Sequence, residues 1–168
     1  MYPESKQQKL KALIEHFRPR RILSIGPAGK ELFADYLAHQ PDCLLDEVLT
    51  APEVEQLEQA GRHDLAFISH VLEKMPKAAA EQLLARLRDV HCHRLIIVVP
   101  IGTDWPQHTS FWQRNDLLAL GFTLVGEFEH DGRPVDIFAF DIASYKTTPD
   151  WLNSKYWANP ELFGKYWW

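Results

Sequence analysis

Cysteine is scarce in this chain, and basic charge and long apolar runs are also limited. Cys43 and Cys92 are the only two cysteines among 168 residues, too few for a disulfide-stapled scaffold. The net charge of -5 argues against a dedicated nucleic-acid binder, which needs a basic face. No apolar run approaches the length of a membrane-spanning helix, and the first residues lack the plan of a signal peptide. We therefore expect a cytoplasmic protein with a small-molecule ligand, and no membrane or nucleic-acid partner.

Aromatic residues are plentiful instead, and many of them lie near the C-terminus. The seven in the last part of the chain are Trp151, Tyr156, Trp157, Phe163, Tyr166, Trp167 and Trp168. Left in water, they would form a patch of the kind that marks an interface or a lid. Three uses are open: packing on the same domain, forming a homodimer, or roofing a ligand pocket. We favour the first, so the sequence predicts one domain over residues 1–142 and an aromatic-rich extension over residues 143–168.

The hydrophobic pattern alternates between strand and helix signals. It predicts helices over residues 4–17, 77–90 and 111–120, with strands over 22–25, 43–50, 64–70 and 95–100. The segments 122–129 and 135–141 are typical of a β-hairpin. This alternation indicates an α/β three-layer fold whose sheet is mostly parallel and ends in an antiparallel hairpin. The stretch between residues 50 and 64 is too short for a full helix and a further strand.

The first strand runs directly into a turn that contains two glycines. Ile22, Leu23 and Ile25 precede Gly26 and Gly29, and a helical pattern begins at Glu31. Glycine lets a ligand approach the backbone closely, and the first N–H groups of the following helix lack partners inside the helix. The turn is therefore either a small-molecule cradle or a tight connection between a strand and a helix.

Three stretches together resemble class I S-adenosylmethionine (SAM)-dependent methyltransferases, especially the small bacterial ones. They are the opening strand and turn at 22–29, the run Asp-Leu-Ala-Phe-Ile-Ser-His-Val-Leu-Glu-Lys-Met-Pro at 64–76, and the strand at 95–100 with Asn-Asp-Leu-Leu-Ala-Leu-Gly-Phe at 115–122 and the hairpin. The resemblance covers about residues 10–142. It implies a Rossmann-like methyltransferase fold with SAM as the cofactor. The short stretch between residues 50 and 64 predicts that the family's third strand is missing.

The resemblance also implies which residues meet the cofactor. These are Ser24, Gly26, Pro27, Ala28, Gly29, Glu47, Ser69 and His70. Three positions depart from the family pattern. Ser24 stands where the family has an acidic residue, and Ala28 and Lys30 stand where further glycines are common. Asp46 and Glu47 are both candidates for the carboxylate that holds the ribose hydroxyls, and we select Glu47.

The acceptor substrate of the family borders the loop after the strand at 95–100, which places Asp104, Trp105 and His108 in a substrate pocket. His70 is the candidate catalytic base, although an ordinary turn residue is the alternative. We expect Glu73 to be a solvated charge. The triplet His91-Cys92-His93 suggests a metal site, but neighbouring strand residues face opposite sides and no second cluster supplies ligands, so we predict no metal. Two functions remain open: a SAM-dependent methyltransferase, or a binding or assembly protein whose methyltransferase-like scaffold has lost the cofactor.

Overall fold

The computed structural model describes residues 3–145, apart from the side chains of Val54 and Tyr145. The elements are α1 (Glu4–Phe17), β1 (Arg21–Ile25), α2 (Gly29–His39), β2 (Leu44–Val48), α3 (Val54–Ala60), β3 (His63–Ser69), η1 (Leu72–Lys74), α4 (Lys77–Arg86), η2 (Leu87–His91), β4 (Cys92–Pro100), α5 (Arg114–Ala119), β5 (Thr123–His130), β6 (Arg133–Asp141) and α6 (Ile142–Tyr145). The aromatic segment predicted for residues 143–168 lies outside the described residues beyond Tyr145.

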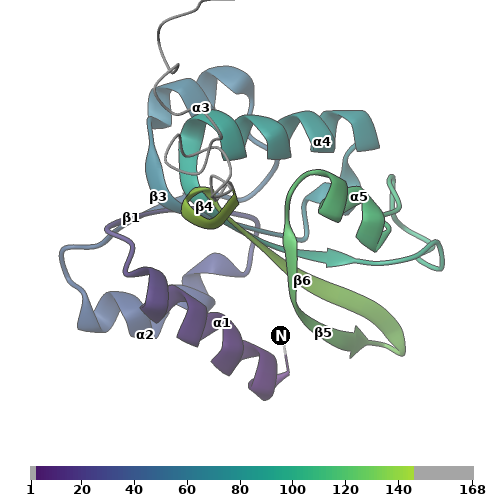
Figure 1. Cartoon of the computed structure of the whole chain (residues 1–168), viewed down its shortest axis with the longest axis horizontal. Helices are drawn as coiled ribbons and strands as arrows, with labels where there is room; N and C mark the ends of the chain where they lie inside the picture. The colour runs from purple at the N-terminus through teal and green to yellow at the C-terminus, as the bar shows by residue number, and fades with distance from the viewer. Residues whose placement is uncertain (1–2, 146–168) are drawn as a thin grey trace, which may run out of the picture.

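The six strands form one sheet in the order β2-β1-β3-β4-β6-β5 (Figure 1). The first four strands of the chain pair in parallel, and β6 pairs antiparallel with both β4 and β5. The predicted α/β fold with a terminal hairpin is therefore confirmed. The backbone between β2 and β3, which is described throughout, forms α3 and no strand. As a result β2 is an edge strand, and its Leu44 is 60% exposed.

Helices cover both faces of the sheet, and each face has its own apolar core. Successive residues of β3 alternate between the two cores: Leu65 and Phe67 join α1 and α2, whereas Ala66 and Ile68 join α3, α4 and α5. Figure 1 shows α1 and α2 below the sheet and α3, α4 and α5 above it. This alternation is the two-residue period of a strand that is buried on both faces.

Two helices are shorter than the sequence predicts. The helix expected over residues 77–90 ends at Arg86 and continues as the π turn η2, which leaves Val90 57% exposed rather than on the apolar side. The helix expected over residues 111–120 begins only at Arg114. The preceding Trp112 is fully buried and bridges Ile101 and Gly102, which holds its backbone in an extended conformation.

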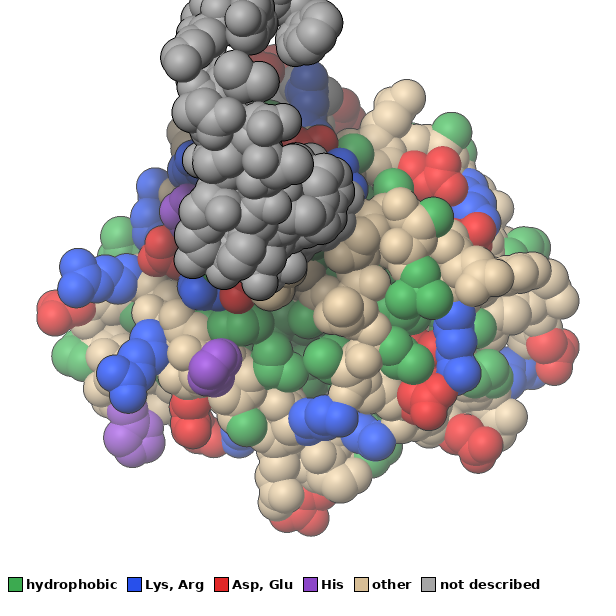
Figure 2. Space-filling view, in the orientation of Figure 1, with side chains coloured by type: hydrophobic (Ala, Val, Ile, Leu, Met, Phe, Trp, Pro, Cys, Tyr) green, Lys and Arg blue, Asp and Glu red, His purple; other side chains and the backbone are tan. Residues whose placement is uncertain are grey.

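Surface charge of both signs is intermixed on the face seen in Figure 2. Lysine and arginine side chains lie among aspartate and glutamate side chains there and form no continuous basic region. Within residues 3–145, every helix is too short or too polar to cross a bilayer.

Gly26 brings the end of β1 into direct contact with the end of β3. Its φ is +108°, and a Cβ at this position would stand 1.9 Å from the carbonyl oxygen of Ser69. The N–H of Gly26 donates to the carbonyl oxygen of Val48 at 2.8 Å, which also ties the turn to β2. Only glycine satisfies both the backbone angle and the available space. Gly26 is therefore required by the packing of three strand ends.

The two causes of the glycine requirement can be separated by experiment. We expect Gly26→Ala to lower the free energy of unfolding by more than about 3 kcal/mol, because backbone strain of about 1–3 kcal/mol adds to the collision with Ser69. The matched control is Gly132→Ala, whose φ is +70° but whose Cβ would meet nothing within 4 Å. This control should lose about 1 kcal/mol. Urea unfolding checks both variants, and equal losses would contradict the role given to the Ser69 contact.

Candidate functional site

The carboxyl ends of the parallel strands carry two neighbouring features, of which the glycine turn is the first. Gly29 opens α2 directly above Ser24, and a Cβ on Gly29 would stand 1.8 Å from Ser24 Oγ. Ser24 is fully buried, and its hydroxyl has no hydrogen-bond partner among the described residues. Its side chain lies beneath the turn, and we do not assign it the cofactor contact that the sequence suggested.

Glu47 lies on the outer side of the same turn. It is the last residue but one of β2 and pairs in register with Ser24. One carboxylate oxygen, Oε1, is 3.9 Å from the position that a Cβ on Gly29 would take, and the residue is exposed. The first turn of α2 has no side-chain cap on its N–H groups, and the Lys30 side chain is exposed. An accessible carboxylate thus stands beside the uncapped N-terminus of a helix of 11 residues.

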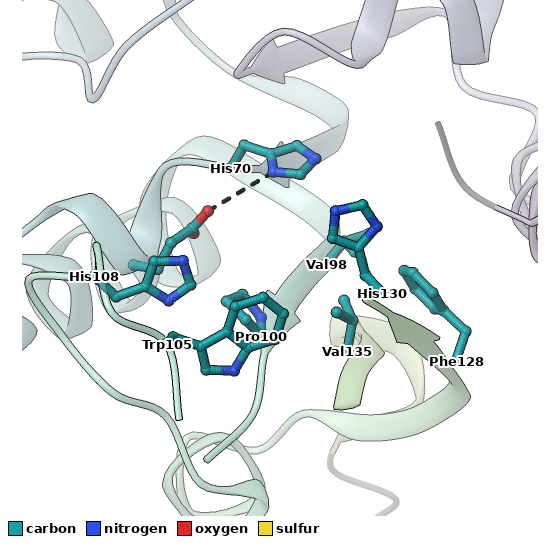
Figure 3. Close-up of a pocket in the computed structure, with 9 residues that line it drawn as sticks. His70, Val98, Pro100, Trp105, His108, Phe128, His130 and Val135 are labelled. Atoms are coloured by element: carbon teal, nitrogen blue, oxygen red, sulfur yellow. Dashed lines mark ion pairs between the residues drawn. The ribbon is translucent and has the colours of Figure 1, made fainter. Parts of the chain in front are cut away.

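The second feature is a cavity of about 200 Å³. Every strand end that lines it lies at the same edge of the sheet, because β6 begins beside the end of β4 and β5 ends beside the start of β6. Figure 3 shows the lining side chains converging from the turn after β3, the loop after β4 and the β5–β6 hairpin. They are His70, Glu73, Val98, Pro100, Trp105, His108, Phe128, His130 and Val135.

Backbone hydrogen bonds fix the loop after β4 against the turn after β3. The amides of Thr109 and Ser110 both donate to the carbonyl oxygen of Glu73, at 2.8 Å and 3.1 Å. The Ser110 hydroxyl donates to the carbonyl oxygen of Leu72 at 2.9 Å, and the Trp105 indole N–H donates to that of Ile101 at 3.0 Å. The loop therefore forms a defined wall of the cavity.

Glu73 is not the solvated charge that the sequence predicts. Its side chain is only 3% exposed and lies 3.8 Å from His70 Nδ1, measured from Oε1. The other oxygen, Oε2, has no hydrogen-bond partner within the described part of the chain. Burial raises the pKa of this carboxyl above its ordinary value of 4.5, since an apolar environment disfavours the charged form.

The imidazoles of the cavity favour the neutral form. Burial, followed by the nearby charge of Lys74, lowers the pKa of both His70 and His108 below 6.5. The φ of His70 is +58°, a conformation uncommon for a residue other than glycine. His108 stacks on Trp105 with the ring centroids 5.0 Å apart and the planes at 8°. Despite these side chains, residues 3–145 contain no group of three or more candidate ligands placed to hold a metal ion.

The triplet His91-Cys92-His93 does not form a reactive site. Cys92 is buried, and its Sγ lies 3.1 Å from the carbonyl oxygen of Leu87, to which the thiol donates. Burial raises the pKa of this thiol to about 12, so it stays protonated and is a poor metal ligand. His93 instead faces Asp64 at 3.8 Å.

The structure brings together most of the residues that the sequence singled out. His70, Trp105 and His108 line the cavity, whereas Asp104 is 95% exposed, lies near Arg133 at 3.8 Å and does not line it. Ser69 is buried, and its carbonyl faces Gly26. Six lining residues were not among the predicted site residues: Glu73, Val98, Pro100, Phe128, His130 and Val135. The hairpin signal could have indicated the last three, because it places the β5–β6 hairpin beside the carboxyl ends of the parallel strands.

Solved structures with a similar fold include methyltransferases and a domain with SAH bound. Magnesium protoporphyrin IX methyltransferase (ChlM) from Synechocystis PCC 6803 with bound SAM is 14% identical, with a TM-score of 0.52 over 80% of this chain and 78% of that chain. The N-terminal domain of EvdMO1 with SAH bound is 15% identical, with a TM-score of 0.53 over 83% and 82%. A putative O-methyltransferase from Nostoc punctiforme PCC 73102 is 15% identical, with a TM-score of 0.54 over 80% and 55%. The protein therefore has a class I methyltransferase-like fold.

The family is shown by the sequence itself. A family model matches residues 4–168, and the chain belongs to this family, which is described as a family of unknown function (DUF6231). A search of the curated proteins found no match.

The buried carboxyl of Glu73 makes a prediction about stability and pH. Because its pKa is higher in the folded protein than in the unfolded chain, the stability linked to this proton is present below pH 4.5 and is lost as the pH rises toward the folded-state pKa. Glu73→Gln removes this loss of stability, because glutamine carries no proton that titrates in this range. We expect the free energy of unfolding of the variant, minus that of the wild type, to grow with pH. The total growth is about 1.4 kcal/mol for each unit by which the folded-state pKa exceeds 4.5.

Urea unfolding at several pH values between about 4 and 8 checks this expectation. The control variant is Glu129→Gln, at an exposed position of β5. This control removes a carboxyl of the same kind outside the cavity, so the comparison isolates the effect of position 73. A flat difference for Glu73→Gln would mean that the carboxyl is not desolvated in the folded protein.

Proposed function

We propose that the protein binds SAM at the carboxyl edge of its sheet and transfers the methyl group to an acceptor in the cavity. The observation that carries this proposal is the exposed carboxylate of Glu47 beside the uncapped start of α2, with Gly29 between them. A carboxylate can accept hydrogen bonds from both ribose hydroxyls, and helix N–H groups suit the carboxylate of the cofactor's amino acid part. The structural neighbours that hold SAM or SAH support the same assignment.

The residues present fit this group in the following way. The backbone of Pro27, Ala28 and Gly29 would meet the amino acid part, and Glu47 the ribose. His70 follows Ser69, whose carbonyl lies against Gly26, so the turn and the cavity are directly adjacent. When bound, SAM supplies an electrophilic methyl group on a positively charged sulfur. The chain's contribution is to hold the acceptor in line with that group and to exclude water, and orientation alone can supply much of the acceleration.

Two observations favour the alternative, a binding or assembly protein that has lost the cofactor. Where the resemblance expects an acidic residue, the structure has the fully buried Ser24. Among residues 3–145, no strand pairs with the outer edge of β2, where the family has its third strand. On this alternative Glu47 is an ordinary surface charge, and neither SAM nor its product is bound.

Calorimetric titration with SAM and with SAH distinguishes the two functions. We expect binding of both ligands, and we expect Glu47→Gln to weaken it about tenfold or more, since a hydrogen bond to a charged group contributes about 1.5–3 kcal/mol. The matched control is Glu15→Gln, which changes an exposed glutamate of α1 in the groove at the opposite edge of the sheet. This control should bind like the wild type.

Two results would reject the proposal. No heat with either ligand at millimolar concentration would favour the alternative function. Binding that is equally strong in Glu47→Gln and in the wild type would show that the ribose is held elsewhere. Gly26→Val is unsuitable as a binding test, because the added side chain would collide with the carbonyl oxygen of Ser69 and disturb the fold itself.

A further inference from the structure

Glu73 has an unused hydrogen-bond acceptor at the cavity. The side chain lines the cavity and is 3% exposed, and its Oε2 has no hydrogen-bond partner among the described residues. Figure 3 shows a dashed line from His70 to a carboxylate, and this contact of 3.8 Å is made by Oε1 of Glu73. A buried polar atom without a partner costs free energy, so a ligand that donates a hydrogen bond to Oε2 would remove this cost.

The other walls of the cavity are mostly flat or apolar. Trp105 and His108 form a nearly parallel stack, and Phe128 contributes a third ring from β5. Val98, Pro100 and Val135 supply the aliphatic surface. The volume of about 200 Å³ is below the roughly 300–1,000 Å³ of sites for drug-sized ligands. A single planar ring with small substituents suits this space.

The charges around the cavity favour a neutral ligand that donates hydrogen bonds. Burial favours the neutral forms of His70 and His108 by lowering the pKa of each imidazole. Lys74 is exposed close by, and the Arg133 guanidinium lies 5.5 Å from the centre of the Trp105 ring. These two cations disfavour a positively charged ligand. The Glu73 carboxylate and the neutral imidazoles offer hydrogen-bond acceptors to a hydroxyl group.

We propose that the cavity binds a small neutral aromatic hydroxyl compound of the phenol class, whose O–H donates to Glu73, and that this compound is the methyl acceptor. The second half of the proposal rests on the proposed function, whereas binding of the compound does not. Glu73 is then a catalytic residue, because it touches the reacting hydroxyl.

The proposed step transfers a methyl group to the hydroxyl oxygen and a proton to Glu73. The hydroxyl proton passes to the Glu73 carboxylate as the oxygen lone pair forms a bond to the methyl carbon. The carbon–sulfur bond of the SAM co-substrate breaks, and its electron pair stays on the sulfur, which becomes a neutral thioether. The products are an aryl methyl ether and a protonated Glu73. The carboxylic acid then returns its proton to solvent, for which the half-exposed His70 is the nearest titratable relay.

Binding of phenol to the full-length protein tests the proposal without SAM. Dissociation constants are measured from the NMR shift of the Trp105 indole N–H, with phenol, toluene and benzylammonium as probes. Toluene has nearly the same shape as phenol but no donor, and benzylammonium carries a positive charge. We expect phenol to bind about tenfold or more tightly than toluene, because the hydrogen bond to a carboxylate is charge-assisted. Benzylammonium should bind more weakly than phenol.

Two substitutions assign the preference to Glu73. Glu73→Leu should erase the preference for phenol over toluene, and Glu73→Gln should reduce it, because an amide oxygen still accepts but carries no charge. Glu129→Gln, at an exposed position outside the cavity lining, should keep the full preference. If the leucine variant fails to fold, the glutamine variant still tests whether the preference for phenol depends on Glu73.

Several outcomes would overturn the proposal. These are equal binding of phenol and toluene, a preference for phenol that survives unchanged in Glu73→Gln, or tighter binding of benzylammonium than of phenol. The absence of binding by any probe at about 10 mM, a binding free energy weaker than roughly 3 kcal/mol, would also overturn it. The SAM titration separates this failure from that of the proposed function. A protein that binds SAM but not phenol loses only the acceptor class. One that binds phenol but not SAM keeps the cavity as a ligand site and loses methyl transfer.

Discussion

The close approach of Gly26 to the carbonyl oxygen of Ser69 determines the geometry of the whole carboxyl edge. A side chain at position 26 would need space that the end of β3 already occupies, so the turn and that strand end can meet only at a glycine. Ser69 in turn directs the chain into His70, whose positive φ orients the next turn toward the loop after β4. The cofactor side and the acceptor side of the proposed site are therefore linked through a single backbone contact.

The short connection between β2 and β3 leaves the outer edge of β2 open. With α3 alone between β2 and β3, β2 has no neighbour on its outer edge among the described residues, and Glu47 is exposed. In the proposed site this exposure leaves Glu47 accessible to a ribose, whereas the missing third strand would leave adenine with less surface to pack against. Access to Glu47 would strengthen binding of the nucleoside, whereas the loss of packing surface for adenine would weaken it. Affinity for the nucleoside would then depend more on hydrogen bonds to Glu47 than on apolar contact.

The sequence predicted the fold because its signals are local. Apolar runs such as Leu95–Pro100 and the glycine turn mark strands and their ends, and the alternation of strand and helix restricts the topology. The burial of Glu73 was not predictable in this way, because the loop that covers it belongs to a distant part of the chain and is held by the amides of Thr109 and Ser110. A similar limit applies to Asp104, which lies in the predicted loop but is exposed and does not line the cavity. Spacing places a residue in a loop but does not determine which loop side chains face inward.

Two features of the cavity carry a cost in free energy that an inert scaffold would not need. Ser24 could be buried in either kind of protein, because its hydroxyl only supports the turn from beneath. Glu73 is different, since a leucine of similar size would fill the same space without leaving a carboxylate oxygen unpaired. His70 adds backbone strain at the same point, and strained residues together with a buried carboxylate oxygen that lacks a partner are typical of sites that act on a ligand. Both features line one cavity at the edge where an open α/β sheet binds its ligands, which a purely structural role does not require.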